Sequence, residues 1–126
     1  MKHQKFFICD LCKNLVGLID DGGGQLVCCG QDMTELIPNS VDAHEEKHVP
    51  VAALEGDTLT VKVGSAPHPM DAVHYIEFVY VETARGGQRK RLKAGDAPSC
   101  TFLLGGDKPT AVFAYCNIHG LWQAEL

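Results

Sequence analysis

The sequence predicts an all-β protein in two parts, a small metal-bound module followed by a β-sandwich of about seven strands. Four of the six cysteines lie within the first 30 residues, a segment too short to bury a core of its own. From residue 49 onward apolar and polar residues alternate with a period of two, which is typical of half-buried strands. Turn signals interrupt this second part at spacings of roughly 8 to 12 residues or somewhat more, as in sandwiches.

The length and net charge of the chain limit the classes of function it can have. A chain of 126 residues holds one domain, or one modest domain plus a metal-held module, and the cysteines favour the second. The net charge of −5 argues against nucleic-acid binding, and no apolar run approaches the ~18 residues of a membrane span. Residues 1–8 lack the apolar core and cleavage site of a signal peptide, so we expect a cytoplasmic location. In a reducing cytoplasm, six cysteines are expected to bind metal rather than form disulfides.

The first predicted metal site uses Cys9 and Cys12, in a Cys-x-x-Cys knuckle, together with the adjacent pair Cys28 and Cys29. Four thiolates can hold one ion tetrahedrally and stabilise a short segment. A zinc ribbon separates its second pair by two residues, so we expect the adjacent cysteines to be strained. The alternative is a Cys9–Cys12 redox pair with two buried thiols, although no βαβ pattern surrounds it.

The rest of the module is a short apolar strand at residues 15–19 and a glycine-rich turn at residues 20–24. We interpret that turn as a hairpin turn rather than a phosphate cradle, because neither a helix pattern nor Gly-Lys-Ser/Thr follows it. Residues 37–47 are polar with one proline, as expected of a linker with a short helical turn. The predicted domains are therefore 1–37 and 38–126.

The sandwich prediction is of the immunoglobulin-like type, with two packed sheets. Period-two alternation is clearest in residues 59–63 and 76–80. The large apolar residues are expected in the core rather than against a cofactor; they are Trp122, Phe102, Phe113 and Leu104. Residues 89–91, Arg-Lys-Arg, are expected to be a solvated strand end, with docking of an acidic partner as the alternative. Cys100 is interpreted as a small apolar strand residue.

A second cluster of metal-binding residue types lies beyond the linker. Cys116-x-x-His119 closes an apolar strand, and three more histidines, His48, His68 and His74, fall at strand starts or in turns. Each histidine alone would be an ordinary polar residue, but together they can converge on one point. A thiolate with four imidazoles exceeds the four ligands of structural zinc and favours a redox-capable metal, with iron the natural candidate. His3 and His44 are expected at the surface.

These motifs resemble those of desulfoferrodoxin, the two-iron class of superoxide reductase, over essentially the whole chain. The N-terminal cysteines resemble a desulforedoxin-type iron site. The remaining motifs resemble the catalytic site; they are Glu46-Lys47-His48-Val49-Pro50, His68-Pro69-Met70, His74-Tyr75-Ile76 and Cys116-Asn117-Ile118-His119-Gly120.

The resemblance implies two irons, one bound by four cysteines and one by five ligands with the sixth position open. The five are His48, His68, His74 and His119 in a plane and Cys116 on the axis. It further implies one-electron reduction of superoxide to hydrogen peroxide, a rubredoxin-like electron donor and a homodimer.

Two charged residues complete the implied catalytic site. Glu46 would be the sixth ligand of resting ferric iron. Lys47 would attract superoxide and assist protonation, unless it is a plain surface lysine. Two rival functions remain open from the sequence: a two-iron electron carrier without catalysis, and a zinc-stapled interaction module in which the histidines are incidental.

Overall fold

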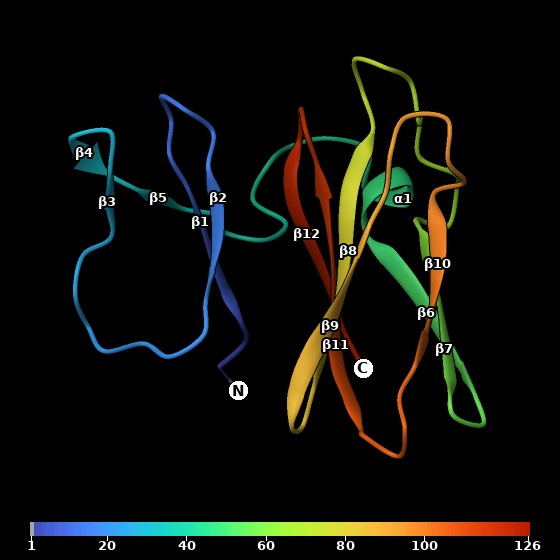
Figure 1. Cartoon of the computed structure of the whole chain (residues 1–126). Helices are drawn as coiled ribbons and strands as arrows, with labels where there is room; N and C mark the ends of the chain where they lie inside the picture. The colour runs from blue at the N-terminus through green and yellow to red at the C-terminus, as the bar shows by residue number, and fades with distance from the viewer. Residues whose placement is uncertain (1) are drawn as a thin grey trace. The chain divides into compact units, whose positions relative to one another are not determined.

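The computed structural model describes residues 2–126, which form two compact units, residues 2–37 and residues 38–126. Figure 1 shows the chain as strands with one short helix, in line with the all-β prediction. None of the helices formed by residues 2–126 has the length and apolar character needed to cross a membrane.

The first unit contains two small sheets. Strands β1 (Lys5–Ile8), β2 (Leu15–Leu18) and β5 (Thr34–Glu35) form an antiparallel sheet in the order β2-β1-β5. Strands β3 (Val27–Cys28) and β4 (Gln31–Asp32) pair with each other. Within residues 2–37 the buried apolar side chains are Phe6, Cys9 and Met33. So small a core cannot stabilise a fold by itself, which agrees with a requirement for a metal.

The hairpin turn predicted at residues 20–24 is wrong. Strand β2 pairs with β1 and strand β3 pairs with β4, so the segment between β2 and β3 joins two different sheets. This segment is largely exposed and offers no apolar face to a partner strand. Asp21 organises it instead, because its carboxylate accepts hydrogen bonds from Lys5 Nζ at 3.1 Å and from the Gly23 N–H at 2.9 Å.

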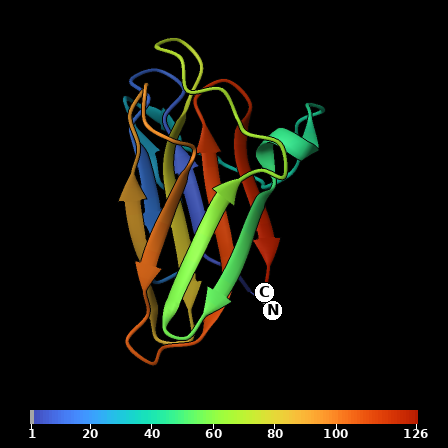
Figure 2. The ribbon, with the colours of Figure 1, turned by 90° about the vertical axis from the view of Figure 1, so that its right-hand side faces the viewer.

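The second unit is the predicted sandwich of seven strands in two sheets. One sheet has the order β10-β7-β6 and the other β12-β11-β8-β9. Figure 2 shows the two sheets packed face to face. The strands are β6 (Pro50–Glu55), β7 (Thr58–Val63), β8 (Ile76–Thr83), β9 (Gly86–Arg91), β10 (Ser99–Leu103), β11 (Pro109–Cys116) and β12 (Gly120–Glu125).

Alternate residues of both sheets point inward and form one core. The core includes Val61 of β7, Val79 of β8, Phe102 of β10 and Val112 of β11, all fully buried. Cys116, at the end of β11, belongs to the same core. The rigid sandwich therefore holds one of the predicted metal ligands directly.

Helix α1 (Glu45–His48) is the short helical turn expected near the linker. It ends where Pro50 opens β6, because the residue before a proline disfavours helical backbone. The loop between β7 and β8 and the turn between β11 and β12 lie at the same end of the sandwich as α1 (Figure 2). Three segments distant in sequence thus meet at one end of the fold.

Candidate metal centres

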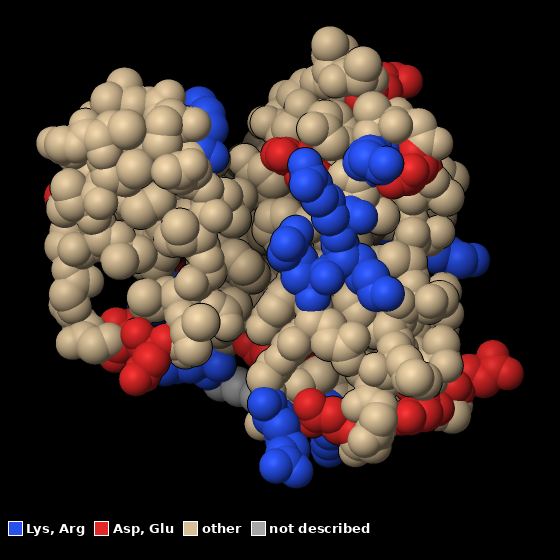
Figure 3. Space-filling view, viewed as in Figure 1, with Lys and Arg blue, Asp and Glu red and all other residues tan. Residues whose placement is uncertain are grey.

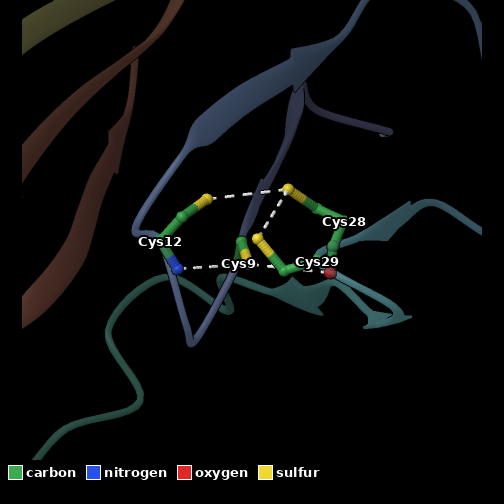
Figure 4. A group of neighbouring side chains, drawn as sticks. All are labelled: Cys9, Cys12, Cys28 and Cys29. Carbon is green, nitrogen blue, oxygen red and sulfur yellow. Dashed lines mark hydrogen bonds between the residues drawn. The ribbon is translucent and has the colours of Figure 1, made fainter.

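The four N-terminal cysteines lie together in the structure. Cys9 and Cys12 come from the turn after β1, Cys28 ends β3 and Cys29 follows it (Figure 4). Their sulfur atoms all lie within 4.8 Å of one another, with 3.6 Å between Cys12 Sγ and Cys28 Sγ. All four are free thiols. This convergence favours a single metal site over the redox-pair alternative.

Backbone N–H groups surround the sulfurs of the Cys-x-x-Cys turn. The Cys12 N–H points at Cys9 Sγ, 3.5 Å away, and the Asn14 N–H points at Cys12 Sγ, 3.4 Å away. Such donors stabilise a thiolate, and the Cys12 N–H is the largest cause that lowers the pKa of Cys9 to about 7. The turn is therefore arranged for thiolate ligands.

The strain expected from adjacent cysteines is found at Cys29, whose φ is 53°. Successive side chains of a strand point to opposite faces, so a regular strand would separate the two sulfurs. The left-handed backbone at Cys29 turns its thiol back, to 4.0 Å from Cys28 Sγ. Contact with the Cys12 thiol raises the pKa of Cys29 to about 12. Four sulfurs this close need a cation before all of them can ionise.

The second cluster joins the three segments at the end of the sandwich. His48 ends α1, His68 and His74 lie between β7 and β8, and Cys116 ends β11. One donor atom from each of these four residues lies within 4.8 Å of the others. His119 is outside this group of four, yet its Nδ1 lies 3.2 Å from His48 Nε2 and 3.9 Å from Cys116 Sγ. The structure therefore brings the five predicted residues together, with His119 beside the group of four.

Hydrogen bonds to backbone carbonyls orient two of the rings. His48 Nδ1 lies 2.7 Å from the His44 carbonyl, and His68 Nδ1 lies 2.6 Å from the Pro69 carbonyl. Each Nδ1 must donate to its carbonyl, which leaves the Nε2 lone pair free. The two Nε2 atoms are 3.1 Å apart. His119, in contrast, directs Nδ1 toward His48 and Cys116. It is only three residues from Cys116 in the sequence.

The protonation states suit metal binding. Burial lowers the pKa of His48 and lowers that of His68 to about 4, so both are neutral near pH 7. Neutral imidazole is the form that binds metals. Burial raises the pKa of Cys116, while its sulfur receives the His119 N–H at 3.4 Å. A bound cation would supply the charge that keeps this buried thiol ionised.

His74 gives the most direct indication that this cluster binds a metal ion. Its Nε2 is buried and has no hydrogen-bond partner among residues 2–126. An unpaired buried polar atom costs about 1–3 kcal/mol, so such atoms are rare without a function. Imidazole and thiolate donors together suit a transition metal such as iron. The residues present therefore fit a metal ion at this point.

Glu46 and Lys47 directly precede His48, but neither side chain makes a hydrogen bond or ion pair with the cluster in the part of the chain that the structure describes. The exposed Glu46 carboxylate lies 3.3 Å from His44 Nδ1. The Glu46 carbonyl is held by the Ala66 N–H at 2.7 Å and the Ser65 hydroxyl at 3.3 Å. Lys47 is half-buried. The catalytic roles of the two side chains stay predictions.

Two supporting residues were missed from the sequence. Trp122 was predicted as a core residue, and its ring indeed lies in the interior, but it also stacks on His48. Gly64 is buried where a Cβ would lie 2.7 Å from the Glu46 carbonyl oxygen and 2.9 Å from that of Val49. Nothing in the sequence signals either contact, because both depend on how distant segments meet.

Comparison with known proteins adds a family and a fold. Residues 40–125 match the family described as desulfoferrodoxin, and residues 2–36 match the desulfoferrodoxin N-terminal domain. A desulfoferrodoxin homologue of Archaeoglobus fulgidus is 48% identical, covering 96% of both chains. A desulfoferrodoxin of Syntrophotalea carbinolica is 45% identical, covering 93% of this chain and 92% of its own. The superoxide reductase of Treponema pallidum has a similar structure, with a TM-score of 0.83, 35% identity and coverage of 98% and 100%.

Proposed function

The chain belongs to the desulfoferrodoxin family, and from this premise we propose that it is a superoxide reductase. The reaction is the one-electron reduction of superoxide, with uptake of two protons, to hydrogen peroxide. The observation that carries the proposal is the cluster of buried and half-buried imidazoles and one buried thiol around the unpaired His74 Nε2. The similarity to the superoxide reductase of Treponema pallidum supports it.

Two iron ions are the cofactors, and the two donor groups fit them. We assign the first iron to Cys9, Cys12, Cys28 and Cys29, in a domain of residues 1–37. We assign the second to His48, His68, His74, His119 and Cys116, in a catalytic domain of residues 38–126. Five protein donors leave one of six positions for substrate, whereas an electron carrier needs no open position.

When bound, the ferrous form of the second iron supplies the electron that superoxide takes up. The protein supplies the rest. His44 and Pro69 hold two ligand rings in one orientation through their carbonyls. Lys47 places a positive charge one residue from His48, which draws in an anion despite the net charge of −5. Its ammonium Nζ can also hold a proton donor near the reacting oxygen. Glu46 would bind the resting ferric form, and an external donor of the rubredoxin type would restore the ferrous form.

The test is the stoichiometry of peroxide formation. The anaerobically reduced protein, with its iron content measured, is mixed with a pulse of superoxide. A reductase forms one peroxide for each superoxide consumed, whereas dismutation forms one for every two and releases oxygen. Formation of half the expected peroxide, or iron oxidation that does not depend on superoxide, would rule out the proposed function.

A further inference from the structure

Three cationic side chains gather on one face of the sandwich. Strand β9 pairs with β8 so that Arg89 lies opposite Tyr80 and Arg91 opposite Phe78. Paired residues share a face, so both arginines project from the outer face of this sheet, while Lys90, opposite the core residue Val79, projects from the other. Figure 3 shows lysine and arginine side chains gathered over β8 and β9.

These two arginines and Lys93 line an open cavity of about 280 Å³, and we call the three side chains the basic patch. All three are exposed. The ion pairs Lys5–Asp21 and His44–Glu46 lie outside the patch. The lining holds one carboxylate, Glu77, against three cations. A patch with excess positive charge on a protein of net charge −5 is suited to an acidic partner.

The basic patch adjoins the backbone that carries two of the proposed ligands. Tyr75 lines the same cavity and directly follows His74. Its N–H donates to Asn117 Oδ1 at 2.9 Å, and its carbonyl accepts from the Asn117 N–H at 3.2 Å. Asn117 in turn follows Cys116. A molecule bound at the patch therefore contacts Tyr75, which is bonded covalently to His74. Tyr75 also leads to Cys116 through its hydrogen bonds with Asn117.

We propose that the basic patch is the docking surface for a small acidic protein that delivers electrons to the second iron. This inference rests on the proposed function, in which each superoxide consumed leaves one ferric ion. The donor loses one electron, the ferric ion gains it, and no bond or proton passes between the two proteins. Transient electron-transfer encounters use small interfaces and depend on charge for their association rate.

The alternative user of the patch is superoxide itself. Superoxide is an anion, so a basic patch could also raise its local concentration. An acidic protein partner is favoured over superoxide because the patch is an open surface. The proposed position of superoxide is instead at the histidine and cysteine cluster beside Lys47. The two users act in opposite halves of the catalytic cycle, so kinetics can separate them.

The test compares two triple variants of the iron-loaded protein. R89Q/R91Q/K93Q removes the patch, and K62Q/K90Q/K108Q removes the same charge from exposed positions of the second unit outside the patch. Reduced rubredoxin, an acidic one-electron carrier, is the probe. The second-order rate constant for reduction of the ferric protein should fall at least about 10-fold in the patch variant and less than about 3-fold in the control, with a flatter salt dependence.

Two further measurements keep the outcomes distinct. The rate of superoxide with the ferrous patch variant should stay within about 2-fold of the unmodified protein. Rubredoxin binding, measured by calorimetry at low and high salt, should weaken only in the patch variant. If the patch variant reacts more slowly with superoxide but is still reduced by rubredoxin at the normal rate, the patch attracts the substrate. If both triple variants lose the same fraction of the rubredoxin rate constant, the effect comes from net charge and not from the patch. Either result overturns the inference. Failure of the unmodified protein to reduce superoxide would refute the proposed function, while the binding arm would still decide the docking surface.

Discussion

Trp122 stacks on His48, with ring centroids 4.7 Å apart and an angle of 26° between the planes. The same indole donates its Nε1–H to the His119 carbonyl at 3.2 Å. One core residue therefore supports two of the five proposed ligands, one by ring contact and one through the backbone. Partners of this kind orient ligands, and their loss typically weakens metal affinity about 10- to 100-fold.

Trp122→Leu is expected to remove both supports and to weaken iron binding at the second site by about 10-fold or more. Trp122→Phe keeps a ring on His48 and should lose less. Competition with a chelator measures the affinity. Phe102→Leu, also in the core, is the control for a general loss of stability. Equal iron release from Trp122→Leu and Phe102→Leu would refute a specific role for Trp122.

Gly64→Ala is expected to displace the segment that carries Glu46, Lys47 and His48. The new Cβ would press on two backbone carbonyls rather than on movable side chains. Overpacking of this kind costs about 1–3 kcal/mol. The melting temperature of the second unit should fall, and the spectrum of the second iron should change. Gly24→Ala meets open space and should change neither. A Gly64→Ala protein with an unaltered spectrum would contradict this account.

Cys12→Ser should abolish the first iron and loosen residues 1–37, yet leave superoxide reduction within about 2-fold of normal. The reason is that every proposed catalytic ligand lies in the other unit, and that metal binding is coupled to folding in so small a module. Metal analysis and the peroxide assay, run on the same sample, test this. Catalysis that declines in parallel with the first iron would show that the two sites depend on each other.

Cys116→Ser is expected to abolish turnover more completely than any single histidine change, because it removes the only anionic ligand among the five. A thiolate also donates electron density to the iron. Cys100→Ser is the matched control, since Cys100 lies half-buried on β10 and belongs to neither cluster. It should keep both irons and normal turnover. Retention of metal and near-normal turnover in Cys116→Ser would exclude Cys116 as a ligand.

Lys47→Ile should keep both irons, because an ammonium cannot coordinate metal. The rate constant for superoxide with the ferrous protein should fall about 10-fold or more, with a weaker dependence on ionic strength. Lys62→Ile, an exposed lysine on β7, is the control and should leave the rate unchanged. Pulse radiolysis at two salt concentrations makes the comparison.

Glu46→Ala separates the second charged residue from Lys47. It should change the ferric spectrum, because the proposed sixth ligand is lost, while the first encounter rate stays close to normal. An unchanged rate and salt slope in Lys47→Ile would instead leave Lys47 as ordinary solvated surface.

The sandwich could be predicted because period-two alternation directly reports which face of a strand is buried. The seven strands, the two sheets and the interior position of Trp122 and Phe102 are confirmed. Glycines predict a tight turn but not which strands it joins, so the loop at residues 20–24 was misread as a hairpin. Pairing there is set by the contacts of β1, which lie elsewhere in the sequence.

The two donor clusters could also be anticipated, because cysteines and histidines at strand ends can point toward one place. Their detail could not. The nitrogens that His48 and His68 present are set by the carbonyls of His44 and Pro69. The positive φ of Cys29 is what lets the adjacent thiols face one point. These features depend on the local backbone conformation, which the type of a single residue does not specify.

The donors of the two clusters are separated by different lengths of chain, so the two clusters form at different stages of synthesis and folding. Cys12 and Cys28, whose sulfurs touch, are 16 residues apart, so the first site can be completed while most of the chain is still unmade. His48 and His119 are 71 residues apart, and their meeting requires β11 and β12 to have joined the sandwich. Closing the longer loop costs more entropy and comes late in folding. The first metal can therefore bind a short stretch of chain, whereas the second needs a sandwich that β11 and β12 have already joined.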